Sequence, residues 1–205
     1  MKNKQLILAA KLISVLFAPH YFPLLCLLVL MAFSYMKALP IDYKLIVLAL
    51  VYVMTIALPV LLISLYRKVM GLRHHELSRR EMRTMPYIIS IGCYLLCYYA
   101  MDSLYVPHFI VSVVVASLIV QIICLIVNGW HKVSSHSAAA GAMNGALIAF
   151  SFIFHFNPVW WLCLTLVIAG CVGSSRLVLR HHTMSEVGIG FGVGFVTGFL
   201  TILLS

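Results

Sequence analysis

Long apolar runs separated by short polar segments dominate this chain. Membrane-spanning helices are expected at about 20–36, 44–66, 86–102, 106–127, 138–155, 158–173 and 187–204. Each run is close to the ~20 residues that an α-helix needs to cross ~30 Å of hydrocarbon, and none alternates like a barrel strand. Residues 5–18, flanked by Lys2 and Lys4, are expected to form an interfacial helix. The pattern predicts an all-α, polytopic transmembrane helical bundle of six to seven spans.

The composition supports lipid as the main solvent of the chain. Hydrophobic residues make up 63% of it and charged residues only 9%, with a mean hydropathy of +1.08. A soluble domain would carry about 25% charged residues. We therefore treat residues 1–205 as a single transmembrane domain, in which 1–43 hold the interfacial helix and the first span. All six cysteines lie within apolar runs, and we interpret them as small buried residues.

Three polar segments remain, at 67–86, 128–137 and 174–186. Two spans separate each from the next, so counting spans places all three on one side of the bundle. In the glycine-rich last span, Gly190 and Gly194 form a small-xxx-small pair that allows close helix contact.

The segment 128–137 reads Trp-His-Lys-Val-Ser-Ser-His from Trp130 to His136 and leads into a helix of small residues. Free backbone N–H groups and the dipole at a helix start favour an anion there. The alternative interpretation is that Ser134 or Ser135 merely caps the helix.

The segment 174–186 carries Arg176, His182 and Glu186. Arginine binds phosphate oxygens through its fork of donors, and a neutral histidine can attack phosphorus. Glu186, four residues after His182, lies on the same face if the helix has begun by His182, and it can then hold the second ring nitrogen. The alternative is a basic interfacial loop followed by one glutamate at a helix start.

These two segments resemble signatures of the type 2 phosphatidic acid phosphatase family, which shares its fold with vanadium haloperoxidases. The pattern Ser-Arg-x5-His-x3-acid, then Val-x-x-Gly, is similar to the third signature, and Val133 to His136 looks like the second, Pro-Ser-Gly-His. The matching positions of the third signature are Ser175, Arg176, His182, Glu186, Val187 and Gly190. The resemblance covers residues 128–194, the expected catalytic core.

The chain departs from the family pattern in several places. Glu186 stands for the usual Asp, and Val133 and Ser135 stand for Pro and Gly. The first signature, Lys-x6-Arg-Pro, is missing in that form. The residue expected to supply its cation is Lys132. Bacterial members with Trp-Lys-x-Ser-x-His look similar here, although this chain inserts His131 between Trp130 and Lys132. Accessory candidates before Pro86 are Arg79, Arg80 and Arg83.

The resemblance implies a membrane phosphatase that needs no metal or other cofactor. The phosphate is expected to bind Arg176, Lys132, Ser134 and the amide of Ser135. His182 would be the nucleophile, oriented by Glu186, and His136 the proton donor to the leaving oxygen. His181 is either a neighbour of the nucleophile or a further positive charge. The expected substrate is a lipid phosphate or isoprenoid pyrophosphate among the membrane lipids.

The formal net charge of +9 fits anionic headgroups or an anionic substrate, and we expect no nucleic-acid partner. The missing first signature keeps open a non-enzymatic pseudo-phosphatase or lipid-binding protein. A metal enzyme or transporter using His136, His181, His182 and Glu186 is a further alternative, opposed by the neighbouring cations. Neither the particular lipid nor the oligomeric state follows from the sequence.

The expected location is a bacterial inner membrane. Basic residues at 67–83 favour a cytoplasmic face for the site by the positive-inside tendency, whereas the family works on the extracytoplasmic face. If the arginines bind substrate, their charge does not report topology. The extracytoplasmic face is therefore the expectation.

Overall fold

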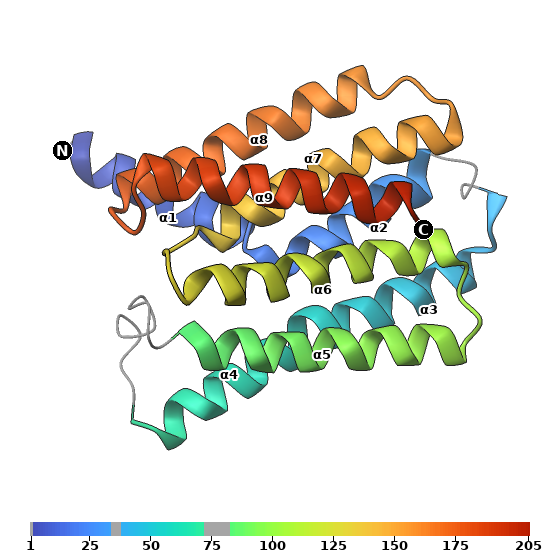
Figure 1. Ribbon diagram of the computed structural model, residues 1–205, viewed down its shortest axis with the longest axis horizontal. Coiled ribbons are helices and arrows are strands. Elements are labelled where there is room, and N and C mark those ends of the chain that lie inside the picture. The colour runs from blue at the N-terminus through green and yellow to red at the C-terminus, as the bar shows by residue number, and fades with distance from the viewer. Residues whose placement is uncertain (1, 34–37, 72–82) are drawn as a thin grey trace.

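The computed structural model describes residues 2–33, 38–71 and 83–205, and every regular element within these ranges is helical (Figure 1). The elements are α1 (Lys2–Leu16), η1 (Pro19–Tyr21), α2 (Phe22–Phe33), α3 (Ile41–Tyr52), η3 (Val53–Ala57), α4 (Leu58–Val69), α5 (Thr84–Ser103), α6 (His108–Asn128), α7 (Ser135–Phe154), α8 (Val159–Val178) and α9 (Met184–Leu203). The chain is an all-α polytopic bundle, as predicted.

Seven segments of the described chain are long and apolar enough to cross a membrane. The second, Ile41–Val69, joins α3 to α4 through the single π-helical turn η3. The first, Lys4–Ala32, combines α1, η1 and α2. Residues 5–18, expected to form a separate interfacial helix, thus share one apolar segment with α2. The break between them falls at Pro19, which has no N–H to continue a helix.

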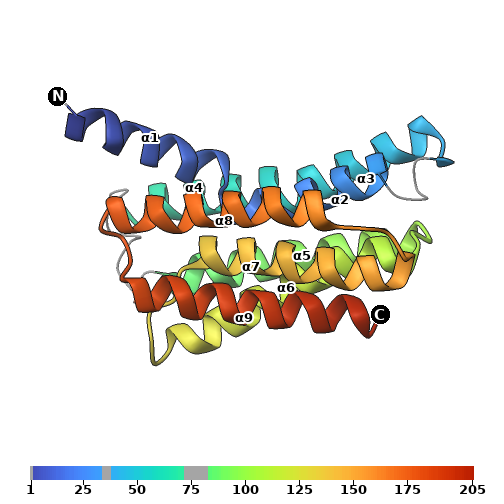
Figure 2. The same ribbon diagram turned by 90° about the horizontal axis from the view of Figure 1, so that it is seen from above.

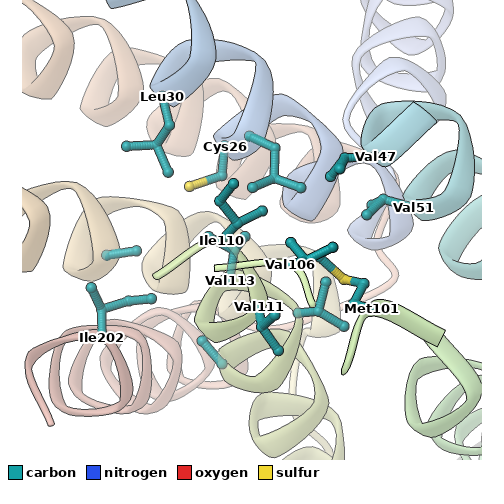
Figure 3. Close-up of a cluster of buried hydrophobic side chains, with 14 of the residues drawn as sticks. Cys26, Leu30, Val47, Val51, Met101, Val106, Ile110, Val111, Val113 and Ile202 are labelled. Atoms are coloured by element: carbon teal, nitrogen blue, oxygen red, sulfur yellow. The ribbon is translucent and has the colours of Figure 1, made fainter. Parts of the chain in front are cut away.

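The main hydrophobic core lies in one half of the bundle (Figure 3). Side chains from six helices, α2, α3, α5, α6, α7 and α9, meet there. Among the cluster's residues are Cys26, Leu30, Val47, Val51, Met101, Val106, Ile110 and Ile202. Met101 lies in the last turn of α5, and Val106 lies between α5 and α6. This part of the core is therefore at the opposite end of α6 from the α6–α7 connection. The other half, next to the α6–α7 and α8–α9 connections (Figures 1 and 2), contains a cavity whose α7 wall includes Ala139, Ala142 and Ala146.

Helices α7 and α9 pack backbone to backbone (Figure 2). A Cβ atom added at Gly194 would collide with the main chain of Ala138, and one at Gly141 with the main chain of Phe191. A Cβ at Gly190 would lie 2.7 Å from the carbonyl oxygen of Ser134. The predicted small-xxx-small contact of Gly190 and Gly194 is therefore confirmed, and it holds the starts of both helices together.

The expectation for the cysteines is correct for four of the six. Cys26, Cys93, Cys97 and Cys124 are buried, whereas Cys163 and Cys171 lie exposed on α8. In a membrane protein an apolar run contacts lipid as readily as protein, so apolar surroundings in sequence do not separate these two cases.

The α7–α9 contact generates a prediction about stability. Gly194→Ala must push the two backbones apart and should lower the free energy of unfolding by about 1–3 kcal/mol, as overpacking does. Gly192→Ala is the matched control, because Gly192 lies two positions before Gly194 on the same helix and an added Cβ there meets no other atom. Thermal unfolding in detergent, followed by circular dichroism, measures both. Equal stabilities of the two variants would show that the backbones are not in contact.

Candidate active site

Hydrogen bonds join the three polar segments at one end of the bundle. The amide of Ser134 donates to the carbonyl oxygen of Glu186 at 3.2 Å, and Lys132 Nζ donates to the carbonyl oxygen of His181 at 2.7 Å. From the first segment, Arg83 Nη1 donates to the carbonyl oxygen of Val133 at 3.3 Å. The convergence expected from the span count is therefore present. Arg79 and Arg80 lie outside the described residues.

His182 lies between a carboxylate and a guanidinium. Its Nδ1 is 2.6 Å from Glu186 Oε2, and its Nε2 is 3.4 Å from Arg83 Nη2. Because a guanidinium only donates, Nε2 must be the acceptor, and the ring proton lies on Nδ1 toward Glu186. The lone pair of Nε2 therefore points to the side of the site that holds Arg83.

Burial and neighbouring cations keep His182 neutral. The residue is 7% exposed. Burial lowers its pKa from 6.5 to about 3, and the charges of Arg83, Arg176 and Lys132 act in the same direction. The pKa of Lys132 is itself lowered by burial and by Arg83, although Glu186 partly offsets this. His182 is thus a neutral imidazole among cations at neutral pH.

Arg176 and His136 both contact Ser14 of α1. Arg176 Nη1 donates to Ser14 Oγ at 2.6 Å, and His136 Nε2 donates to the Ser14 carbonyl oxygen at 3.2 Å. The charge of Arg176 acts on His136, and the rings of His136 and His182 lie close enough to interact electrostatically, so the two motif histidines share one site. Sequence reasoning missed Ser14, because a serine in an apolar N-terminal helix, 162 positions before Arg176, carries no local signal.

The two serines of the second motif have different positions. Ser134 is completely buried, and its Oγ accepts from the amide of Ser137 at 3.3 Å and from the Ser137 hydroxyl at 3.1 Å. The capping interpretation therefore describes Ser134, whose hydroxyl is not directed to the site. Ser135, one position later, lines a cavity beside the site.

A cavity of about 360 Å³ opens among these residues. The polar side chains at its outer end are Arg83, Ser135, His136, Arg176 and His181, together with His20 from η1, which the sequence analysis did not single out. Three buried nitrogens of this group have no hydrogen-bond partner in the described part of the chain: Arg176 Nε, His181 Nδ1 and His20 Nδ1. Oxygen atoms of a bound anion would satisfy such groups.

Comparisons with protein-family models, with curated proteins and with solved structures find no match to this chain. The chemistry of the site must therefore be argued from its own geometry. Within the described ranges, no group of three or more His, Cys, Asp or Glu side chains is arranged to hold a metal ion. The donor set is dominated by arginine, lysine and histidine, which suits an anion.

The electrostatics of His182 give a testable titration. At pH 5 an ordinary histidine, with a pKa near 6.5, is mostly protonated. His182 should remain neutral there and take up a proton only near pH 3. Arg83→Gln removes a cation that opposes protonation, so it should raise the His182 pKa toward 6.5. Imidazole ¹⁵N NMR in detergent measures both forms, and an unchanged titration in Arg83→Gln would contradict the contact between the two side chains.

Proposed function

We propose that this chain is an integral membrane phosphatase that hydrolyses a lipid phosphate or lipid pyrophosphate through a phosphohistidine on His182. The observation that carries the proposal is the state of His182, whose Nδ1 is held by Glu186 at 2.6 Å while its unprotonated Nε2 faces Arg83. A neutral nitrogen whose lone pair accepts only from Arg83 can attack an electron-poor phosphorus once the anionic oxygens of a substrate draw that guanidinium away. The resemblance of both motifs to the type 2 phosphatidic acid phosphatase family supports the same chemistry.

The cations of the site would hold the phosphate. Arg176 offers an unpartnered Nε, and Arg83 contacts the attacking nitrogen directly. Lys132 is bound to the His181 carbonyl oxygen and adds charge at the edge of the site. Arg83 therefore fits the place of the missing first-signature cation better than Lys132. The free amide of Ser135, at the start of α7, can donate a further hydrogen bond.

The first step forms a bond between His182 Nε2 and phosphorus and breaks the bond from phosphorus to the leaving oxygen. Positive charge develops on the His182 ring, and Glu186 stabilises it through Nδ1–H. The leaving oxygen takes a proton from His136, whose imidazolium form the neighbouring phosphate stabilises. Because His136 Nε2–H points to the Ser14 carbonyl oxygen, the leaving group must replace that acceptor.

The second step is hydrolysis of the phosphohistidine. His136, now neutral, takes a proton from water, and the water oxygen attacks phosphorus as the bond to His182 Nε2 breaks. Inorganic phosphate leaves, and His182 returns to its neutral form with Nδ1–H on Glu186. In these two steps His136 gives the proton to the leaving oxygen and takes one from water, and His182 keeps its Nδ1 proton throughout.

A phosphate-binding protein without catalysis is the second candidate, because the first signature is absent in its usual form. It would use the same cations but would form no bond to His182. A covalent phosphohistidine therefore separates the two candidates, whereas lipid binding alone does not.

The proposal is tested by phosphate release from a panel of lipid phosphates and pyrophosphates in mixed micelles. His182→Asn removes the nucleophile and should lower the rate at least about 10⁴-fold, as loss of a nucleophile does in other covalent enzymes. His155→Asn, at the far end of α7, is the matched control and should retain the wild-type rate. Radiolabelled phosphate should also be trapped on the protein in the wild type only, when the reaction is quenched in alkaline detergent, because the P–N bond of phosphohistidine is stable to base and labile to acid. Release by His182→Asn at the wild-type rate would refute the mechanism.

We also propose that the site faces the extracytoplasmic side of a bacterial inner membrane, as the resemblance implies. The α8–α9 connection carries His182, and α9 then crosses the bundle, so Ser205 lies at the opposite end (Figure 1). A tag after Ser205 should therefore resist an impermeant protease added to spheroplasts, while a tag before Lys2 should be cleaved. The reverse result would place the site in the cytoplasm.

A further inference from the structure

The cavity beside the site extends deep into the bundle. On α7 it is lined from Ser135 to Ala146, on α6 from Cys124 to Val113, and on α5 as far as Tyr94. The first two stretches each cover eleven residue steps, which corresponds to a depth of about 16 Å at 1.5 Å per residue. From the connection end of the bundle, this depth reaches about half of a ~30 Å hydrocarbon layer.

Charge divides the cavity into two parts. The arginines and histidines of its lining all belong to the site end. The deeper wall is formed mainly by small or apolar side chains, namely Val113, Ala116, Ala139, Ala142, Met143 and Ala146. Three uncharged polar residues, Ser90, Ser117 and Gln121, interrupt it. The Ser117 hydroxyl is already used, because it donates to the carbonyl oxygen of Val113 at 2.9 Å.

Alanines create much of this space. Ala139, Ala142 and Ala146 follow one another along the cavity side of α7, and Ala116 lines it from α6. Larger side chains at these positions would fill the interior, as they do in the core around Met101 and Ile110 farther along the bundle. A cavity with an anion-binding end and an apolar interior matches an amphiphile with a phosphate at one end.

We propose that this cavity holds the hydrocarbon chain of the substrate inside the bundle while the phosphate lies against Arg176 and His182. The inference rests on the proposed phosphatase function and adds where the chain of the lipid lies. Lipid tails are as apolar as the cavity wall, so transfer from the bilayer gains little from the hydrophobic effect. Selectivity must come from contact and shape, which depend on how far a chain fills the cavity.

Two variants that place the same side chain at different depths of the cavity test the proposal. Ala139→Phe and Ala146→Phe place the same side chain about 6 Å and about 16 Å from Ser135 along α7. Phosphate release is measured for two series of increasing chain length, prenyl phosphates and monoacylglycerol phosphates, in mixed micelles. The ratio of long-chain to short-chain rate should fall about 10-fold or more in both variants. In Ala139→Phe, whose new side chain lies nearer the site, the rate should begin to fall at a shorter hydrocarbon chain than in Ala146→Phe.

The control variant is Val196→Phe, which adds similar volume on a face of α9 where Val196 is exposed. It should keep the wild-type dependence on chain length. Suppose that the wild type hydrolyses both substrate series while Ala139→Phe and Ala146→Phe leave the dependence on chain length unchanged in each. The hydrocarbon chain of the substrate then does not enter the cavity. An effect in one series alone identifies which hydrocarbon, prenyl or acyl, the cavity accepts.

A second measurement does not depend on turnover. An alkyl phosphate with a terminal diazirine is bound to the wild-type protein and photolysed, and the labelled residues are mapped. Labels at Val113 or Ala146 would support the cavity assignment even if no lipid phosphate were hydrolysed. Labels confined to lipid-facing positions such as Val196 would overturn it. Failure of hydrolysis with deep labelling would refute the phosphatase function alone.

Discussion

The close contact between α7 and α9 is the constraint on which the site depends. Gly190 and Gly194 let the α9 backbone approach Ser134 and Ala138 with no side chain between them. This approach brings the amide of Ser134 to the carbonyl oxygen of Glu186, so the starts of the two helices are joined directly. His136 and His182 stand at those helix starts, and their mutual position is fixed by backbone packing rather than by a flexible loop.

A second feature is the imbalance of charge at this end of the bundle. Arg83, Lys132 and Arg176 act on one another and on His182, whereas the acidic side chain at the site, Glu186, is paired with His182. Buried cations without enough counter-charge are unfavourable. In the described structure Arg176 uses the hydroxyl of Ser14 as a neutral partner. An arriving phosphate would supply the missing negative charge, and Ser14 marks the place where one of its oxygens would lie.

The tightest part of the hydrophobic core and the cavity lie at different ends of the bundle. The half of the bundle around Met101, Val106 and Ile110 is filled by large apolar side chains. The half next to the site contains the alanines of α7 and a cavity of about 360 Å³. The two parts meet at Cys26, Tyr94, Val113, Ala116 and Ala146, which belong to the core and also line the cavity, so part of the packed core forms the cavity wall.

The sequence by itself determined the elements and part of the site. Long apolar runs have no other stable form in lipid than helices, because every backbone N–H and C=O must be paired within the segment. The four-residue spacing of His182 and Glu186 predicted their contact, which forms although His182 precedes the N-cap Thr183 of α9. The glycine spacing of α9 indicated a close helix contact. The tertiary structure decided the rest, including the cap role of Ser134, the contact of Arg83 with His182 and the arrival of Ser14 and His20 at the site. These residues come from separate helices of nearly uniform apolarity. The rotation of such helices about their axes is set by packing against neighbours, which no local pattern records.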